Sequence, residues 1–229
     1  MKHNFGKTIV VALGGSIVFP DRIDFNFLRR FRKFLLPRLK KRKFILVVGG
    51  GKLSRIYQEA ASKVVRVTDD DKDWLGIHAT RSNAHLLRTI FRDVADPVVI
   101  DSRHKVRKLR HPITVASGWH PGWSTDYIAI RLAADFGAGE AIISGKPDYV
   151  YDKDNVKHKN ARPLPELSWR EYSALIPKKW KPGFSSPVDP VAARLAAKKK
   201  IKAVVINGRN LGNFGKLLRG NGFTGTIIG

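Results

Sequence analysis

The 229-residue chain contains no cysteine, which excludes disulfide bridges and thiolate metal sites and gives no sign of secretion. Long apolar runs are absent too: none approaches the roughly 18 residues that a bilayer-spanning helix needs, and the mean hydropathy is −0.24. We therefore exclude a transmembrane protein. Glycines interrupt residues 1–16 too soon for a signal peptide, so we expect the first strand of a cytoplasmic protein there.

Acidic residues are also scarce. The chain has 19 Asp and Glu against 43 Lys and Arg, so its formal net charge is +24 and its isoelectric point is about 10.6. Such a charge favours phosphate-rich partners: nucleotides, nucleic acids or anionic lipid surfaces. We expect the basic runs at residues 29–43 and 198–202 to be solvated faces, and we expect no membrane partner.

Several motifs with known chemistry are missing. The sequence contains no GxxxxGK[ST] phosphate loop, no GxGxxG dinucleotide fingerprint, no GxSxG nucleophile elbow and no HExxH metal motif. We therefore expect no dedicated metal site. Among the histidines, His120 is the candidate for a binding role, because it lies inside a glycine-rich turn.

Short runs of β-branched residues alternate with amphipathic segments, which predicts an α/β domain with a mostly parallel, helix-covered sheet. Strands are expected at residues 7–13, 44–48, 97–100, 112–116, 141–144, 203–207 and 225–228. Helices are expected at residues 24–36, from 52 onward, at 74–94 after the acidic patch 69–71, and at 127–136, 189–200 and 211–219. Residues 145–165 are polar and irregular, so we expect a long functional loop or a β-hairpin there.

Glycine-rich turns follow three of the predicted strands, at residues 14–16, 49–51 and 118–125. In open parallel sheets, ligands bind outside the carboxyl ends of the strands. Glycine lets backbone amides approach an anion, and the N-terminus of the next helix adds partial positive charge. Lys52 and Arg55 lie one helical turn apart and can place two cations beside phosphates held by the triple glycine. A single Gly-Gly pair is typical of a plain turn, but three glycine-rich turns at strand ends are less readily explained by coincidence and favour a phosphate site.

Six segments, in order, resemble the amino acid kinase family and, within it, the archaeal type of uridylate kinase. They are LGGSIV at residues 13–18, VVGGGKLSRIYQEAA at 47–61, DWLGIHATRSNAHLL at 73–87, GWHPGWSTD at 118–126, SSPVDPVAARLA at 185–196 and GTII at 225–228. The resemblance covers nearly the whole chain. It implies the amino acid kinase fold, a three-layer α/β sandwich. It also implies one domain, with an acceptor-binding lobe at about residues 1–135 and an ATP-binding lobe at about 136–229.

The resemblance also implies an activity, the transfer of the ATP γ-phosphoryl group to UMP, giving UDP and ADP in pyrimidine nucleotide biosynthesis. Magnesium is expected to arrive with ATP. The implied catalytic residues are Lys52, Lys146 and Arg55. The implied ATP-binding residues are Gly15, Ser16, Gly51, Arg55, Gly145, Lys146, Tyr151 and Asp154. The implied UMP-binding residues are Gly50, Asp73, Trp119, His120, Pro121, Gly122, Trp123, Ser124 and Thr125. Family members usually form dimers or hexamers, so a homo-oligomer is expected.

Four features depart from the family pattern. They are Ala12 in place of a lysine that the archaeal type also lacks, PDYVY at residues 147–151 in place of VDGVY, Trp119 and Trp123 in place of threonine and histidine, and Arg194 in place of lysine. The aspartate of VDGVY is kept as Asp148. Trp119 and Trp123 are also compatible with core or subunit-contact positions, and Asp73 and Asp148 with capping carboxylates.

Two other functions remain open. Another small-phosphate kinase of the same fold, such as one acting on isopentenyl phosphate, would share the ATP site. The turn at residues 118–126 argues against it, because a prenyl acceptor needs an apolar tunnel rather than a polar cradle. A non-enzymatic paralogue that binds RNA or oxyanions would use the surplus cations, and its RNA affinity would fall steeply with ionic strength. Nucleic acid is therefore a less favoured partner than ATP and UMP.

Overall fold

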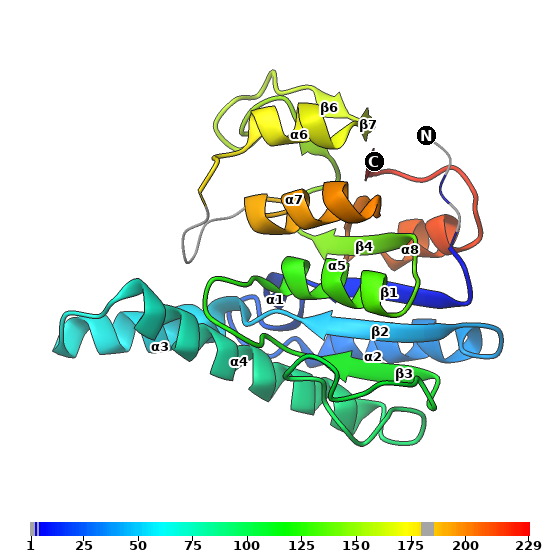
Figure 1. Cartoon of the computed structure of the whole chain (residues 1–229), viewed down its shortest axis with the longest axis horizontal. Helices are drawn as coiled ribbons and strands as arrows, with labels where there is room; N and C mark the ends of the chain where they lie inside the picture. The colour runs from blue at the N-terminus through cyan, green and yellow to red at the C-terminus, as the bar shows by residue number, and fades with distance from the viewer. Residues whose placement is uncertain (1–2, 4, 180–185) are drawn as a thin grey trace.

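A seven-stranded sheet forms the centre of the computed structural model, which describes residues 3, 5–179 and 186–229 (Figure 1). The strand order is β3-β2-β1-β4-β8-β9-β7. The strands are β1 (Thr8–Leu13), β2 (Lys43–Val48), β3 (Ile113–Ala116), β4 (Glu140–Gly145), β7 (Glu166–Leu167), β8 (Lys202–Asn207) and β9 (Thr226–Ile228). All neighbours pair in parallel except β8 and β9, which are antiparallel. The predicted mostly parallel sheet is confirmed.

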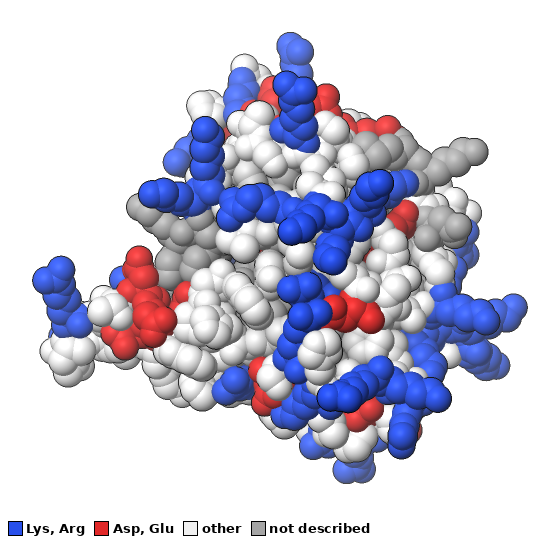
Figure 2. Space-filling model, in the orientation of Figure 1, with Lys and Arg blue, Asp and Glu red and all other residues white. Residues whose placement is uncertain are grey.

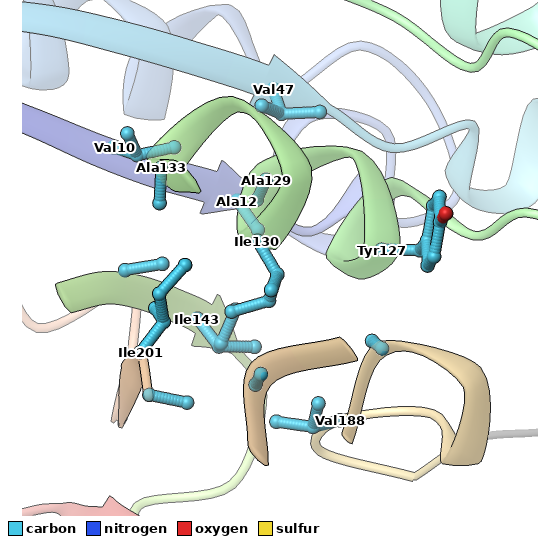
Figure 3. Packing of buried hydrophobic residues seen from close by; sticks show 14 of the residues in the cluster. Val10, Ala12, Val47, Tyr127, Ala129, Ile130, Ala133, Ile143, Val188 and Ile201 are labelled. Carbon is cyan, nitrogen blue, oxygen red and sulfur yellow. The ribbon is translucent and has the colours of Figure 1, made fainter. Parts of the chain in front are cut away.

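Helices cover both faces of this sheet, which explains why its central strands are continuous apolar runs. On one face, α5 (Thr125–Asp135) and α7 (Pro190–Lys199) enclose a core that includes Val10 and Ala12. Figure 3 shows Ala129 and Ala133 of α5 beside these two residues of β1. On the other face, side chains of α2 (Phe25–Leu35), α4 (Asp69–Ile90) and α8 (Leu211–Leu218) enclose a second core. The predicted three-layer sandwich is confirmed.

The remaining elements are short, apart from one helix. They are α1 (Gly15–Val18), a 3₁₀ turn at Leu36–Arg38, α3 (Gly51–Val64), β5 (Val150–Tyr151), β6 (Pro163–Leu164) and α6 (Trp169–Leu175). Strands β5 and β6 form an antiparallel pair, so the β-hairpin expected within residues 145–165 is present. The sequence did not predict α1, α6 or β7. In Figure 1, α3 and the start of α4 project away from the sheet.

Side-chain caps set the helix starts. Asp24 caps α2 by accepting a hydrogen bond from the Phe27 amide at 2.9 Å, so this helix starts where the sequence predicted it. Thr68 and Asp71 form a reciprocal capping box at the start of α4. The expected start of that helix at residue 74 is therefore wrong: the acidic patch 69–71 is its first turn, where carboxylates favourably complement the helix dipole.

The strand expected at residues 97–100 is absent. Only isolated bridges join Ala95 to Ile113 and Ile100 to Ala116. The carboxylate of Asp96 accepts a hydrogen bond from the Val98 amide at 2.9 Å, and the intervening proline has no amide proton to donate. This local turn interrupts sheet pairing, so the segment bonds to β3 near Asp96 and at Ile100 but forms no continuous strand.

Strands from both sides of the expected lobe boundary near residue 135 belong to the same sheet, and the division into lobes stays a prediction. Ser185, the first residue of one of the segments that resemble the family, lies outside the described residues. Among the helices of residues 5–179 and 186–229, none is both long and apolar enough to cross a membrane.

Candidate active site

Two glycine turns touch where β1 and β2 end. Leu13 and Val48, the last residues of these strands, are register partners. A Cβ atom on Gly15 would lie 2.6 Å from the Cα of Gly51 and 2.7 Å from the carbonyl carbon of Gly49, so only glycine fits. Gly51 also has a φ of +65°, a backbone conformation that favours glycine. We call this approach of residues 15 and 49–51 the glycine contact. It unites two of the turns that the sequence assigned to phosphate binding.

Asn83 of α4 fixes the second of these turns. Its side-chain amide donates to the carbonyl oxygens of Gly49 at 2.9 Å and Gly50 at 3.1 Å, and the residue is 2% exposed. This buried amide satisfies both carbonyl oxygens and so fixes the backbone of the turn. Asn83 lies within a segment that resembles the family, but no role was predicted for it, because its partners lie more than 30 residues away in the chain.

The same helix holds the turn that follows β3. The Thr80 hydroxyl accepts a hydrogen bond from the Gly118 amide at 2.8 Å, and the Asp73 carboxylate accepts one from the Gly122 amide at 2.7 Å. Burial raises the pKa of Asp73, and repulsion from the nearby Asp70 adds to the shift. The carboxylate of Asp73 therefore positions the turn at residues 118–125, and its contact with UMP stays a prediction.

The aromatic residues of that turn have different surroundings. Trp119 is 6% exposed and its indole donates to the Ile100 carbonyl at 3.2 Å, so its side chain belongs to the core. Trp123 is half-buried, with its ring 4.8 Å from that of Tyr127 and 5.5 Å from that of the exposed His120. Trp123 and His120 are thus the aromatic side chains that the turn offers to a ligand. The other predicted UMP-binding residues of the turn are half-buried: Pro121, Gly122, Ser124 and Thr125.

A hydrogen-bonded pair joins the starts of α5 and α7. Ser124 accepts from the Tyr127 amide at 3.0 Å and donates to the Asp189 carboxylate. Asp189, 4% exposed, accepts in turn from the Val191 amide at 2.7 Å. Burial, with the negative charge of Asp189, raises the pKa of Asp126 in the first turn of α5 well above its usual range. Asp126 was not among the predicted site residues. The sequence did contain a signal for it: Asp126 lies in the first turn of a helix that begins at a predicted cap, Ser124, directly after a glycine-rich turn.

The end of β4 contributes the third side of the site. The Gly145 carbonyl accepts from the Gly208 amide at 2.9 Å, and Lys146 follows with an exposed side chain. Tyr151, on the hairpin beyond, is half-buried and its ring makes an edge contact with that of Tyr149 at 6.3 Å. Burial raises the pKa of Tyr151.

Asp154 is engaged within the hairpin. Its carboxylate accepts from the amides of Val156 at 2.9 Å and Lys157 at 3.3 Å, which is an Asx-type turn. The hydrogen bond from Val156 lowers the pKa of Asp154. This exposed carboxylate therefore orders the tip of the hairpin, and its predicted role in ATP binding stays a prediction.

Cations lie on both sides of β1. Lys52 follows β2 and Lys146 follows β4, and these two strands flank β1 in the sheet. Lys52 is half-buried in the first turn of α3, and its amide donates to the Phe19 carbonyl at 3.0 Å. Arg55 is exposed one turn later, and Ser16 is half-buried in α1. Within the ranges described, no three His, Asp or Glu side chains come together in a way that could hold a metal ion. Glycine amides between cations suit a polyphosphate, to which magnesium would come already bound.

Two of the positions that depart from the family pattern are now placed. Ala12 is 2% exposed in the core beneath α5. Arg194 is exposed on α7, where its guanidinium donates to the Lys178 carbonyl at 3.2 Å. The Arg194 side chain thus tethers the chain that precedes the undescribed residues 180–185.

The sheet order and the paired glycine turns define a class of nucleotide-binding α/β protein. The amino acid kinase family matches residues 7–207, and the chain belongs to this family. It is 34% identical over 215 residues to the uridylate kinase of Pyrococcus abyssi, covering 93% of this chain and 95% of that protein. It is also 34% identical over 209 residues to the uridylate kinase of Methanocaldococcus jannaschii, covering 87% and 90%.

Solved structures agree with this assignment. The uridylate kinase from Archaeoglobus fulgidus superposes with a TM-score of 0.83 at 29% identity, over 98% of this chain and all of that one. The UMP kinase from Ureaplasma parvum superposes with a TM-score of 0.77 at 19% identity, over 97% and 98% of the two chains, and supports the fold alone. The resemblance drawn from the sequence motifs is confirmed.

Proposed function

We propose that the protein is a uridylate kinase, which transfers the γ-phosphoryl group of magnesium-bound ATP to UMP and yields UDP and ADP. The observation that carries the proposal is the glycine contact, held by α4 together with the turn at residues 118–125. The relatives described above, which bear that name and align over most of their length, support it. The activity would serve pyrimidine nucleotide biosynthesis in the cytoplasm.

The proposed chemistry is an in-line displacement. An oxygen of the UMP phosphate bonds to the γ-phosphorus, the bond from that phosphorus to the β,γ-bridging oxygen breaks, and ADP leaves with the bonding electrons. The attacking phosphate is already ionised, so no strong general base is needed. Lys52 and Lys146 would neutralise charge on the group in transfer, with Arg55 in support. Further hydrogen bonds would come from the amides of Gly15, Gly50 and Gly51.

Each substrate is assigned to one side of the glycine contact. UMP would lie against the turn at residues 118–125. The Asp73 carboxylate would lie near its ribose, and His120 and Trp123 would lie near its base. ATP would lie over the end of β4, with its phosphates near Ser16 and Gly51. Its adenosine would lie near the hairpin residues Gly145, Tyr151 and Asp154. The polar, half-buried turn offers hydrogen-bond donors and aromatic rings, which favours a nucleotide over a prenyl phosphate.

The decisive experiment measures ADP release from magnesium-ATP with UMP, CMP, dUMP and isopentenyl phosphate offered separately. We expect turnover with UMP to exceed turnover with each of the others. Activity with only another acceptor would support a kinase activity but contradict UMP as its acceptor substrate. No turnover with any acceptor, from protein whose circular dichroism spectrum shows a folded α/β domain, would contradict an enzymatic role.

We also infer a homo-oligomer, a dimer or a hexamer, in which α3 meets a second copy of the chain. This helix has no buried residue, and the exposed fractions of Ile56, Tyr57 and Val64 are 45%, 55% and 82%. Such apolar surface on a projecting helix (Figure 1) is typical of an interface. Sedimentation velocity should show a species larger than one chain, and Tyr57→Glu should shift it toward the monomer.

A further inference from the structure

Positive charge is not spread evenly over the molecule. Figure 2 shows Lys and Arg side chains in a band over α7 and again over the part of the same face near β3. It shows acidic side chains gathered on the projecting end formed by α3 and α4, where α4 begins with three aspartates. We call the two areas of Lys and Arg side chains, over α7 and near β3, the basic face. Its exposed cations are Arg103, Lys105, Arg107, Lys108, Arg110, Arg194, Lys198, Lys199 and Lys200.

The carboxylates on the basic face are already paired. Arg103 forms a two-bond ion pair with Asp135, at 3.0 and 3.1 Å, and Lys105 pairs with Asp101 at 2.7 Å. In the part of the chain that the structure describes, no ion pair involves residues 107–110 or 198–200. Clustered cations repel one another, and a polyanion would relieve that repulsion.

Two segments of the basic face lie away from the proposed active site. Residues 107–112 lead into the start of β3, and residues 198–200 lead into the start of β8. Both strands run parallel to β1 and β2 in the sheet, so their starts lie at the edge opposite the glycine contact. The cations at residues 107–110 and 198–200 are therefore not placed to hold ATP or UMP, and their clustering calls for another ligand.

The surface of this face fits a nucleic acid better than a membrane. Among the described residues, the large apolar side chains that are exposed all lie outside residues 101–112, 125–135 and 190–200. Peripheral membrane binding usually combines cations with apolar side chains that insert between lipids. Cations without such side chains suit the hydrated phosphates of a nucleic-acid backbone.

A cavity opens within the basic face, between residues 100–107 and the end of α5, with a volume of about 440 Å³. Its polar lining residues are His104, Arg107 and Asp135, and the Asp135 carboxylate is held by Arg103. An apolar pocket beside cations can hold an unstacked base, which only a single strand presents. The apolar side chains that line the cavity are Ile100, Val106, Leu132 and Phe136.

We propose that the basic face binds single-stranded nucleic acid, with backbone phosphates on the cations of α7 and of residues 103–110 and one base in the cavity. This binding is additional to the kinase activity and does not depend on it. RNA and single-stranded DNA share the chemistry, so both are tested.

The test measures fluorescence polarisation of labelled single strands of about 20 nucleotides, as RNA and as DNA, across a range of salt concentrations. Two charge-reversal variants alter the face: Arg107→Glu with Lys108→Glu, and Lys198→Glu with Lys199→Glu. The matched control is Arg29→Glu with Arg30→Glu, which makes the same change in net charge at exposed positions of α2, on the opposite side of the sheet.

We expect each face variant to weaken binding by about tenfold or more. The slope of log affinity against log salt should become shallower by about one for each phosphate that the variant no longer neutralises. The control variant should change affinity by less than about twofold. Saturating UMP should not displace the strand, and ADP release with UMP should be unchanged in all three variants. A preference for RNA over DNA would identify the 2′-hydroxyl as part of the binding site.

Three results would overturn the proposal. An equal loss in the control would mean that total charge, rather than this face, attracts the strand. Equal or tighter binding of a duplex of the same length would remove the base from the cavity and with it the single-stranded partner. Tighter binding to phosphatidylserine vesicles than to the oligonucleotides would assign the face to a membrane.

Discussion

The two sides of the proposed site are built in different ways. On the acceptor side, the turns after β2 and β3 are fixed by Asn83, Thr80 and Asp73, and the first two of these are buried. On the ATP side, Lys146 and Asp154 are exposed, and the carboxylate of Asp154 bonds only within its own hairpin. The acceptor turns are thus held by side chains from a distant helix. On the ATP side, the base of the hairpin is held by the Thr226 hydroxyl, and only its tip relies on local bonds.

The difference indicates how the two substrates would be received. Buried hydrogen bonds to distant partners hold a turn in one arrangement before any ligand arrives, so the cost of ordering it is met during folding. An exposed hairpin tip with local bonds opens at little cost. We therefore expect UMP to meet a prepared surface, and we expect the tip of the hairpin to become fixed only when ATP binds.

The largest effect should follow from breaking the glycine contact. A side chain on Gly15 would overlap the backbone of the turn after β2, so Gly15→Val must separate the two turns. Since a displacement of about 1 Å can cost a hundredfold in rate, we expect ADP release to fall by at least about that factor.

The control for this change is Gly139→Ala, because a Cβ there meets no atom within 4 Å. Its activity should equal that of the parent. Full activity in Gly15→Val would show that the two turns need not touch for catalysis.

The next effect tests the cation beside the glycine contact. Lys52→Ala removes a charge assigned to the transferring phosphoryl group, so kcat should fall by more than about tenfold, with an unchanged circular dichroism spectrum. Lys63→Ala serves as the control, because this lysine lies at the far end of the same helix and its side chain is 73% exposed. An unchanged kcat in Lys52→Ala would remove this lysine from the mechanism.

A smaller effect should follow from releasing the turn after β2. Asn83→Ala leaves two inward carbonyls without their donor, which should cost about 1–3 kcal/mol of unfolding free energy. The KM for UMP should rise more than the KM for ATP if the acceptor side is the prepared one. Urea unfolding measures the loss of stability, and steady-state kinetics measure the two KM values. An equal rise in both KM values would contradict a preformed acceptor side.

Asp126 allows a test by pH. Burial and Asp189 raise its pKa above 3.8, so the folded protein holds this proton more tightly than the unfolded chain does. The contribution of this carboxyl to stability is therefore lost as pH rises from the unfolded value through the raised one. In Asp126→Asn that loss is absent, so the stability of the variant relative to the parent should improve as the pH rises above about 4.

Urea midpoints at several pH values measure this difference, and Asp21→Asn at an exposed position is the control. A pH-independent difference between Asp126→Asn and the parent would mean that this carboxylate is ionised normally in the folded protein.

The smallest effect should come from the hairpin. Asp154→Ala removes hydrogen bonds at an exposed tip, so the thermal midpoint should stay the same. The KM for ATP should rise by about two- to fivefold, and the KM for UMP should stay constant. A clear loss of thermal stability would show that the hairpin is as firmly built as the acceptor side.

Features governed by nearby residues were predictable from the sequence. The buried strands read as continuous apolar runs, and Asp24, Ser124 and Asp189 cap the helices that they were expected to begin. The glycine turns were placed correctly at the strand ends, because local pattern and parallel topology together determine where they lie.

Features decided by distant partners were not predictable. The roles of Asn83 and Thr80 depend on carbonyls and amides that come from other turns. Whether Trp119 faced a ligand or the core was settled by the Ile100 carbonyl, which lies 19 residues earlier in the chain. The strand expected at residues 97–100 failed because a side chain bonded its own backbone, an alternative that hydrophobicity does not reveal.

The hydrogen bonds from α4 to the glycine turns restrict insertions and deletions within this helix. Asp73, Thr80 and Asn83 are spaced by seven and three residues, so all three point toward the strand ends from one side of the helix. Inserting or deleting one residue between them would rotate the later side chains by about 100° and carry them off their partners. The residues between these three, 74–79, 81 and 82, should therefore tolerate substitution far better than any insertion or deletion, whereas the exposed tip of the hairpin should accept both.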